Sequence, residues 1–145
     1  MPPKSYSANF AGYWAEPNIA GIPSKSGVYC VYACTYDKEA NTVSIRKLLY
    51  IGESQDVKTE VSNNKKWDDW RKHLNKGEMP CFNFAPFEAD DRKRVEAALI
   101  FHHKPPENSE YRDTFPFDET TVSTLGKNSE LSEKFTVPRT EKQND

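Results

Sequence analysis

Two tyrosines stand at the ends of two short apolar segments of this 145-residue chain. Tyr29 ends the triplet Gly-Val-Tyr at 27–29, and Tyr50 begins the triplet Tyr-Ile-Gly at 50–52. Two hydroxyls at one sheet edge can orient a water molecule or exchange a proton with it, as general acid–base chemistry requires. The same spacing suits two tyrosines that only pack in a core, so both interpretations stay open at this point.

The segments around the tyrosines predict a hairpin that would bring them together. Residues 27–36 and 42–51 are rich in β-branched and aromatic side chains, and residues 37–41 have the composition of a turn. Antiparallel pairing places the start of the first strand beside the end of the second. Tyr29 and Tyr50 are therefore expected to be neighbours.

Helices and one further strand are expected after the hairpin. Valines and tryptophans at helical spacing predict helices over about 55–62 and 67–74, and alternating phenylalanines predict a third, edge-like strand over 80–88. An aspartate cap and an apolar stripe predict a helix over about 90–103, which the prolines at 105–106 end. The expected fold class is α/β of the α+β kind, with a small central antiparallel sheet flanked by about three helices.

Both ends of the chain differ in composition from this central part. Residues 1–26 are interrupted by prolines and glycines and predict an irregular N-terminal arm. Residues 109–145 are polar and acidic and predict a partly disordered C-terminal tail, with disorder over 139–145. The predicted organisation is one domain over 27–108 between two appendages.

The composition excludes several classes of protein. Hydrophobic residues are 36% of the chain and charged residues 29%, and no apolar run approaches the ~18 residues of a membrane span. The N-terminus lacks the apolar segment of a signal peptide. The cysteines, Cys30, Cys34 and Cys81, lack the spacing of a zinc site and fit reduced thiols in a core. We therefore expect a cytoplasmic protein without membrane contact, and neither a secreted protein nor a coiled coil.

The net charge of −2 does not point to nucleic acid, but the charge is unevenly distributed. Residues 105–145 hold five basic and nine acidic residues, whereas residues 1–104 hold 15 basic and 13 acidic. The basic residues of the longer part gather over 58–72 and 92–94. A mildly basic body is compatible with phosphate contacts, and solvated helix faces would show the same pattern.

The tyrosine triplets and a later segment together resemble the signature of the GIY-YIG nuclease family. Gly-Val-Tyr at 27–29, about twenty further residues and Tyr-Ile-Gly at 50–52 are similar to the motif that names the family. Glu-Ala-Ala-Leu-Ile from Glu96 onward, followed by Pro-Pro-Glu-Asn ending at Asn108, resembles a second family segment. The resemblance covers about 27–108 and implies a small antiparallel sheet flanked by helices, with nuclease activity.

The resemblance implies roles for four residues. Glu96 would hold a single divalent metal, Mg²⁺ or Mn²⁺, with water and phosphate completing its coordination. Tyr29 and Tyr50 would act on the water network, and Asn108 would fix the geometry of the site. Without the resemblance, Glu96 has the features of an ordinary carboxylate on a helix surface.

Two adjacent histidines, His102 and His103, follow Glu96 on the same predicted helix. A metal site of two histidines and one carboxylate needs all three side chains on one face. Because neighbouring helix residues point about 100° apart, both histidines cannot share a site with Glu96, and core or surface roles are expected for them.

Two positions depart from the family pattern. The family usually carries an arginine about ten residues after the tyrosine of Tyr-Ile-Gly and often a histidine or tyrosine four residues later, where this chain has Glu60 and Asn64. Glu60 would repel the scissile phosphate, and an amide such as Asn64 takes up no proton near neutral pH. Arg71 and His73 could supply the cation and the base from the next helix. The residues predicted to contact DNA are Lys58, Lys65, Lys66, Arg71 and Lys72.

These features favour an endonuclease that hydrolyses DNA phosphodiester bonds with one divalent metal. The alternative is a catalytically impaired or inactive nuclease-like module that binds nucleic acid or protein, because Glu60 and Asn64 replace the expected residues. A plain protein-interaction domain, suggested by the acidic C-terminal segment, is a third interpretation.

Overall fold

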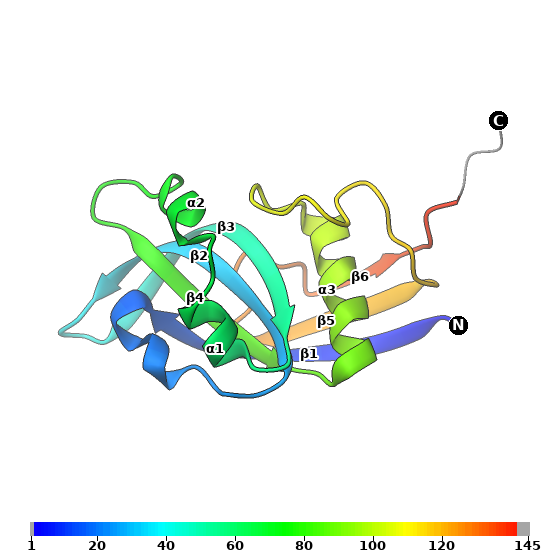
Figure 1. The fold of residues 1–145 in the computed structure, drawn as a ribbon, viewed down its shortest axis with the longest axis horizontal. Coiled ribbons are helices and arrows are strands. Elements are labelled where there is room, and N and C mark those ends of the chain that lie inside the picture. Colours follow the sequence, from blue (N-terminus) through cyan, green and yellow to red (C-terminus); the bar gives the residue numbers. More distant parts are fainter. Residues whose placement is uncertain (1, 142–145) are drawn as a thin grey trace.

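The computed structural model describes residues 2–141, which form a mixed α+β fold around one curled six-stranded sheet (Figure 1). The strands lie in the order β3-β2-β4-β1-β5-β6. In chain order the elements are β1 (Lys4–Ala15), the 3₁₀ helix η1 (Glu16–Gly21), β2 (Gly27–Asp37), β3 (Thr42–Ser54), α1 (Val57–Ser62), α2 (Trp67–Arg71), β4 (Met79–Pro86), α3 (Ala89–His103), β5 (Thr120–Gly126) and β6 (Lys134–Val137). No helix in the described part is long and apolar enough to cross a membrane.

The predicted hairpin of β2 and β3 is confirmed. The two strands pair antiparallel from Gly27 opposite Ser54 to Asp37 opposite Thr42. Residues 27–34 are all buried because alternate side chains of β2 enter two separate cores. The three cysteines are buried free thiols.

Strand β4 was predicted at an edge, and that prediction is wrong: β4 lies between β2 and β1. Its five central residues, 81–85, are all buried. Pro80 and Pro86 stand near the two ends of the strand, so their missing N–H groups leave the central hydrogen bonds intact.

The N-terminal segment is not an irregular arm, because Lys4–Ala15 forms the long strand β1. Tyr6, Ala8 and Phe10 are buried and alternate with exposed residues, as one face of a strand requires. Strand β1 pairs antiparallel with β4 and parallel with β5. The sheet is thus mixed, where an antiparallel sheet was expected.

The C-terminal segment contributes two strands where a partly disordered tail was predicted. Thr120, Val122 and Thr124 of β5 are buried, so polar β-branched residues form part of the sheet's inner face. β5 pairs antiparallel with β6. Within the range predicted to be disordered, the backbone N–H of Thr140 donates to the carbonyl of Phe115, and residues 142–145 lie outside the described part.

The helices cover the two faces of the sheet (Figure 1). α3, predicted over 90–103, packs against β2, β3, β5 and β6 above one core. α1 and η1 pack beside each other over the second core, where α2 places Trp70. α2 is shorter than the predicted 67–74.

One edge strand of the sheet, β3, is irregular, and the other, β6, is short. Along β3, Arg46 and Leu49 are extra residues where the register with β2 shifts. Beside them, the N–H of Glu107 donates to the carbonyl of Leu49 over 3.0 Å. The opposite edge, β6, is four residues long.

Candidate functional site

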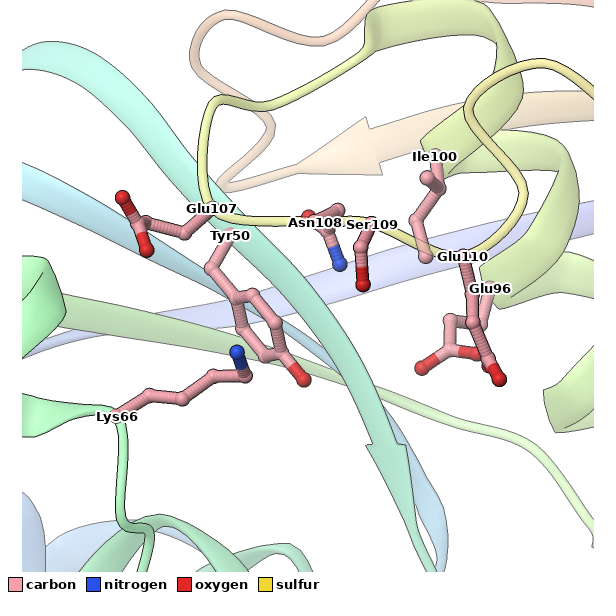
Figure 2. Close-up of a pocket in the computed structure, with 8 residues that line it drawn as sticks. All are labelled: Tyr50, Lys66, Glu96, Ile100, Glu107, Asn108, Ser109 and Glu110. Carbon is pink, nitrogen blue, oxygen red and sulfur yellow. The ribbon is translucent and has the colours of Figure 1, made fainter.

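A pocket of about 250 Å³ opens between β3, α3 and the loop that follows α3 (Figure 2). Its lining includes Tyr50 from β3, Glu96 and Ile100 from α3, and the loop residues 107–110. Lys66, from the segment before α2, extends its ammonium group over the Tyr50 ring at 5.5 Å. Residues 50, 96 and 108, which the sequence singles out in three separate segments, therefore line one pocket.

Tyr29 lies directly behind the pocket and does not line it. Its side chain is fully buried, and its ring centroid is 6.3 Å from that of Tyr50. Gly52 makes this packing possible, because a Cβ atom at that position would lie 2.5 Å from the Tyr29 ring carbon Cζ. The glycine of the Tyr-Ile-Gly triplet thus has a steric role: it leaves room for the tyrosine of the other triplet.

Glu60 and Asn64 meet at the Tyr29 hydroxyl. The hydroxyl donates a short hydrogen bond to Glu60 Oε2, and Asn64 Nδ2 donates to the same carboxylate oxygen over 3.0 Å. Asn64 Nδ2 also lies 3.3 Å from the hydroxyl oxygen. Burial, followed by the charge of Glu60, raises the pKa of Tyr29 well above its usual value. Tyr29 is therefore a neutral hydrogen-bond donor whose proton is directed at Glu60.

Glu96 is a half-buried carboxyl group in acidic surroundings. Burial, and after it the charges of Glu53, Glu110 and Glu60, raises the pKa of Glu96 to about 8. Arg92, one helical turn earlier, acts in the opposite direction and lowers the pKa of Glu96; it pairs with Glu53 and donates to Ser26 Oγ. At neutral pH without a bound cation, Glu96 is mostly protonated.

Tyr50 experiences the same field. Burial and the charges of Glu96 and Glu60 raise the pKa of Tyr50 to about 12. Tyr50 therefore stays protonated at neutral pH, with its ring packed 5.7 Å from that of Trp70.

Asn108 is a structural clamp on the edge of β3. Its Oδ1 accepts from the backbone N–H of Ile51, and its Nδ2 donates to the carbonyl of the same residue, both over 2.9 Å. The carboxamide thus replaces a neighbouring strand at one residue of β3. This arrangement sets the position of the 107–110 loop against Tyr50.

The proposed substitutes, Arg71 and His73, have separate partners. Arg71 forms a two-pronged ion pair with Glu16 of η1 and stacks on Trp67 at 5.2 Å. His73 Nε2 lies 2.6 Å from Glu107 Oε2, and Glu107 lines the pocket. His73 thus reaches the rim of the pocket through Glu107, whereas Arg71 is engaged away from it.

Of the five residues predicted to contact DNA, Lys66 lines the pocket. Lys72 pairs with Asp69 on the exposed side of α2. Lys58 and Lys65 lie on and after α1 and do not line the pocket.

The two histidines of α3 face β6. His102 stacks on Phe135 at 4.2 Å, and His103 binds the carbonyl of Leu99 and the N–H of Ser132 through its two ring nitrogens. Burial lowers the pKa of His103 to about 4, so it is a neutral core residue. Across residues 2–141, no group of three or more histidine, cysteine, aspartate or glutamate side chains is arranged to hold a metal.

Sequence reasoning missed the charged surroundings of Glu96. Arg92 could have been found from its spacing, because it precedes Glu96 by four residues and lies on the same helix face. Glu53 follows the Tyr-Ile-Gly triplet directly, and Glu110 follows Asn108 by two residues. Glu53 and Glu110 influence the pKa of Glu96 only because the hairpin and the loop lie side by side in the fold, and no local sequence pattern predicts that contact.

No family model, no curated protein and no solved structure matches this chain.

Proposed function

We propose that this chain is a nuclease that hydrolyses DNA phosphodiester bonds with one divalent metal, Mg²⁺ or Mn²⁺, at the pocket of Tyr50 and Glu96. The observation that carries the proposal is that Tyr50, Glu96 and Asn108 line one pocket, with Tyr29 packed behind Tyr50. These four residues are the ones to which the GIY-YIG resemblance gives roles. Their segments lie far apart in the chain.

The chemistry of the pocket fits a weakly held, hydrated cation. Glu96 is the carboxylate that would hold it, and a hard cation such as Mg²⁺ keeps most of its waters when few protein ligands are present. When bound, the metal would neutralise phosphate charge and acidify a water molecule. Because binding requires ionised Glu96, its affinity should rise about tenfold per pH unit up to about pH 8 and then level off.

The chain's own residues would bind the phosphate and control protons. Lys66 supplies a positive charge at the pocket, over the ring of Tyr50 (Figure 2). Tyr50 can donate a hydrogen bond to a phosphate oxygen because it stays protonated. Behind the pocket, the Glu60 carboxylate accepts a hydrogen bond from the neutral Tyr29 hydroxyl and so fixes the direction of that proton.

The decisive experiment is incubation with supercoiled, linear and single-stranded DNA in Mg²⁺ or Mn²⁺, with EDTA as the metal-free control. We expect metal-dependent cleavage that Glu96→Gln reduces by at least a hundredfold. Glu133→Gln, an exposed substitution of the same kind outside the pocket, should retain full activity. Cleavage that survives in Glu96→Gln would exclude the proposed role of this carboxylate.

One observation favours a second candidate, a nuclease-like module that binds nucleic acid or protein without cleaving it. Glu60 and Asn64 occupy the Tyr29 hydroxyl with hydrogen bonds, where the resemblance expects an arginine and a histidine. Glu60→Arg combined with Asn64→His should then create cleavage activity that the unchanged chain lacks. If the unchanged chain already cleaves DNA in a metal-dependent way, this second candidate is excluded.

A further inference from the structure

A second pocket, of about 340 Å³, lies at the far end of β2 from the candidate site. Tyr29 stands near the start of β2 and Tyr36 near its end, seven residues further along, or roughly 23 Å at the usual rise of a strand. The side chains that characterise this second pocket are Tyr13, Tyr36, Asn18, Asn41 and Lys127. No acidic residue lines it.

Tyr36 organises two carboxamides in this pocket. Its hydroxyl accepts a hydrogen bond from Asn18 Nδ2 over 3.2 Å and donates one to Asn41 Oδ1 over 3.1 Å. These bonds leave Asn18 Oδ1 as an acceptor and Asn41 Nδ2 as a donor, and neither has a further hydrogen-bond partner within residues 2–141. An acceptor and a donor held on either side of one hydroxyl can read the edge of a nucleobase.

Tyr13 is brought to the pocket by a bulge in β1. Gly12 pairs with Asn83 and Trp14 with Phe82, so Tyr13 is the extra residue between them. Gly12 has a φ of 141°, and a Cβ atom there would lie 3.0 Å from the carbonyl oxygen of Phe82. A bulge redirects a side chain out of the regular ladder. The Tyr13 hydroxyl is then fixed by Ser129, to which it donates over 2.6 Å.

Lys127 projects from a rigid point of the backbone. Its N–H donates to the carbonyl of Phe10 over 2.9 Å, and its own carbonyl accepts from Asn83 Nδ2 over 2.9 Å. Asn83 is itself fully buried in β4. The ammonium group is exposed and has no ion-pair partner within the described chain. It is therefore available to a negatively charged ligand.

We infer that this pocket binds a nucleotide, with its base against the tyrosine rings and carboxamides and its phosphate on Lys127. Base–aromatic contacts and lysine–phosphate contacts are two of the interactions by which proteins hold unpaired nucleotides. A neutral sugar would leave the Lys127 ammonium unmatched. The nucleotide has two possible sources, a free mononucleotide or an unpaired nucleotide of a strand. The inference does not depend on hydrolysis at the first pocket.

The test is calorimetric titration of the whole chain in EDTA with AMP, UMP, adenosine, glucose and a single-stranded hexanucleotide. We expect a mononucleotide or the hexanucleotide to bind at the second pocket. If the natural ligand is a free mononucleotide, AMP should bind at least tenfold more tightly than adenosine. Hexanucleotide affinity more than tenfold above that of AMP would identify a strand as the source. The inference is overturned if none of these nucleotides binds at millimolar concentration, or if glucose binds as tightly as they do.

Two variants locate the binding. Lys127→Ala should weaken nucleotide binding at least fivefold and remove the preference for AMP over adenosine. Tyr36→Phe retains the ring and removes the hydroxyl between the carboxamides, so it should weaken nucleotide and nucleoside alike, by at least threefold. Lys134→Ala, an exposed substitution on β6 outside the pocket, should bind as the unchanged chain does. Equal losses in Lys127→Ala and Lys134→Ala would overturn the inference, because they indicate unspecific charge attraction. The thermal unfolding midpoint confirms that each variant is folded.

Discussion

The Glu60 carboxylate acts on three other groups of the candidate site. Burial is the largest cause of the raised pKa of Tyr29, Tyr50 and Glu96, and the charge of Glu60 adds to it in each case. A single residue that departs from the family pattern therefore influences every group to which the resemblance gives a proton-transfer or metal-binding role.

Glu60→Gln should lower the pKa of both Tyr50 and Glu96. The substitution removes the negative charge but keeps an oxygen that can accept the Tyr29 hydrogen bond, so the buried hydroxyl stays paired. Carboxyl-carbon NMR titration measures Glu96. Because the chain has seven tyrosines, Tyr50 is measured as the difference between ultraviolet phenol titrations with and without Tyr50→Phe. Glu133→Gln is the matched control and should change neither value; unchanged values in Glu60→Gln would contradict the electrostatic coupling.

The raised pKa of Glu96 makes folding stability depend on pH. The folded chain holds this proton to about pH 8, whereas the unfolded chain releases it near its ordinary value of 4.5. The stability associated with this proton is thus fully present below about pH 4.5 and is lost as the pH rises through about 8. Glu96→Gln keeps a neutral side chain at every pH and should therefore be more stable than the unchanged chain at pH 9.

Urea unfolding between pH 5 and 9 checks this expectation. The unchanged chain should lose stability across the range, and Glu96→Gln should give a flatter profile. A steeper or identical profile in the variant would show that Glu96 titrates normally. The result is independent of any nuclease activity.

At the scale of elements, the loop after α3 is positioned by one side chain. Asn108→Ala would remove both hydrogen bonds to Ile51 and leave a backbone N–H and a carbonyl on the edge of β3 unpaired. We expect a loss of about 2–4 kcal/mol in the free energy of unfolding. Ser109→Ala, its exposed neighbour in the same loop, should stay within about 0.5 kcal/mol. Equal stability of the two variants in urea would show that Asn108 does not clamp the strand.

The elements differ in how well sequence could predict them, and the range of their contacts explains the difference. β2, β3 and α3 carry local signals: β-branched and aromatic runs, a turn between them, and a helix rich in apolar residues that two prolines follow. β5 was missed because its buried side chains include threonines. Their polar character made the segment resemble the acidic tail that was predicted from composition.

The missed strand β1 carried a signal in the alternation of Tyr6, Ala8 and Phe10. Its partner β5 lies more than a hundred residues away, so no local pattern identifies the pairing. The contacts of the candidate site differ in the same way. The hairpin signal predicted that Tyr29 and Tyr50 are neighbours. The Tyr29–Glu60 hydrogen bond and the Arg92–Glu53 ion pair depend on helices docking against the sheet, which no local pattern predicts.

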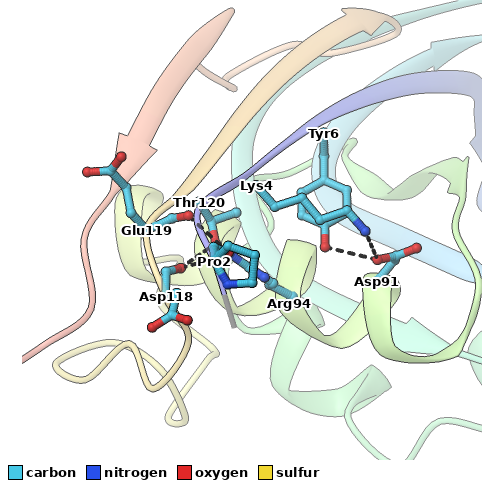
Figure 3. A network of polar contacts seen from close by, with 8 residues as sticks. All are labelled: Pro2, Lys4, Tyr6, Asp91, Arg94, Asp118, Glu119 and Thr120. Atoms are coloured by element: carbon cyan, nitrogen blue, oxygen red, sulfur yellow. Dashed lines mark hydrogen bonds and ion pairs between the residues drawn. The ribbon is translucent and has the colours of Figure 1, made fainter.

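At the scale of the whole molecule, Arg94 joins the N-terminal segment and the start of β5 to α3 (Figure 3). Its buried guanidinium donates to Thr120 Oγ1 at 2.8 Å and to the carbonyls of Pro2 and Glu119 at 3.1 and 3.0 Å. Three residues earlier on α3, the Asp91 carboxylate accepts hydrogen bonds from Lys4 and Tyr6. The starts of β1 and β5, which pair in parallel, are therefore held by one helix.

Arg94→Met should cost about 2–4 kcal/mol of unfolding free energy, because several carbonyl groups lose a buried donor at once. Hydrogen exchange should quicken most at the starts of β1 and β5, where those acceptors lie. Lys93→Met alters the exposed neighbouring residue of α3 and should leave the exchange pattern unchanged. Uniform quickening over the hairpin as well would mean that Arg94 stabilises the whole sheet and not these two starts.

The irregular edge of β3 has a consequence for how copies of this chain meet one another. A flat, unpaired edge is a template on which a second molecule can add its own strand, and growth of this kind leads to fibrils. In this sheet, the extra residues Arg46 and Leu49 disturb the hydrogen-bond ladder along β3, and the Asn108 carboxamide is hydrogen-bonded to the backbone of Ile51. The strand at the other edge, β6, is only four residues long. We therefore expect concentrated solutions of the folded chain to resist aggregation through sheet extension.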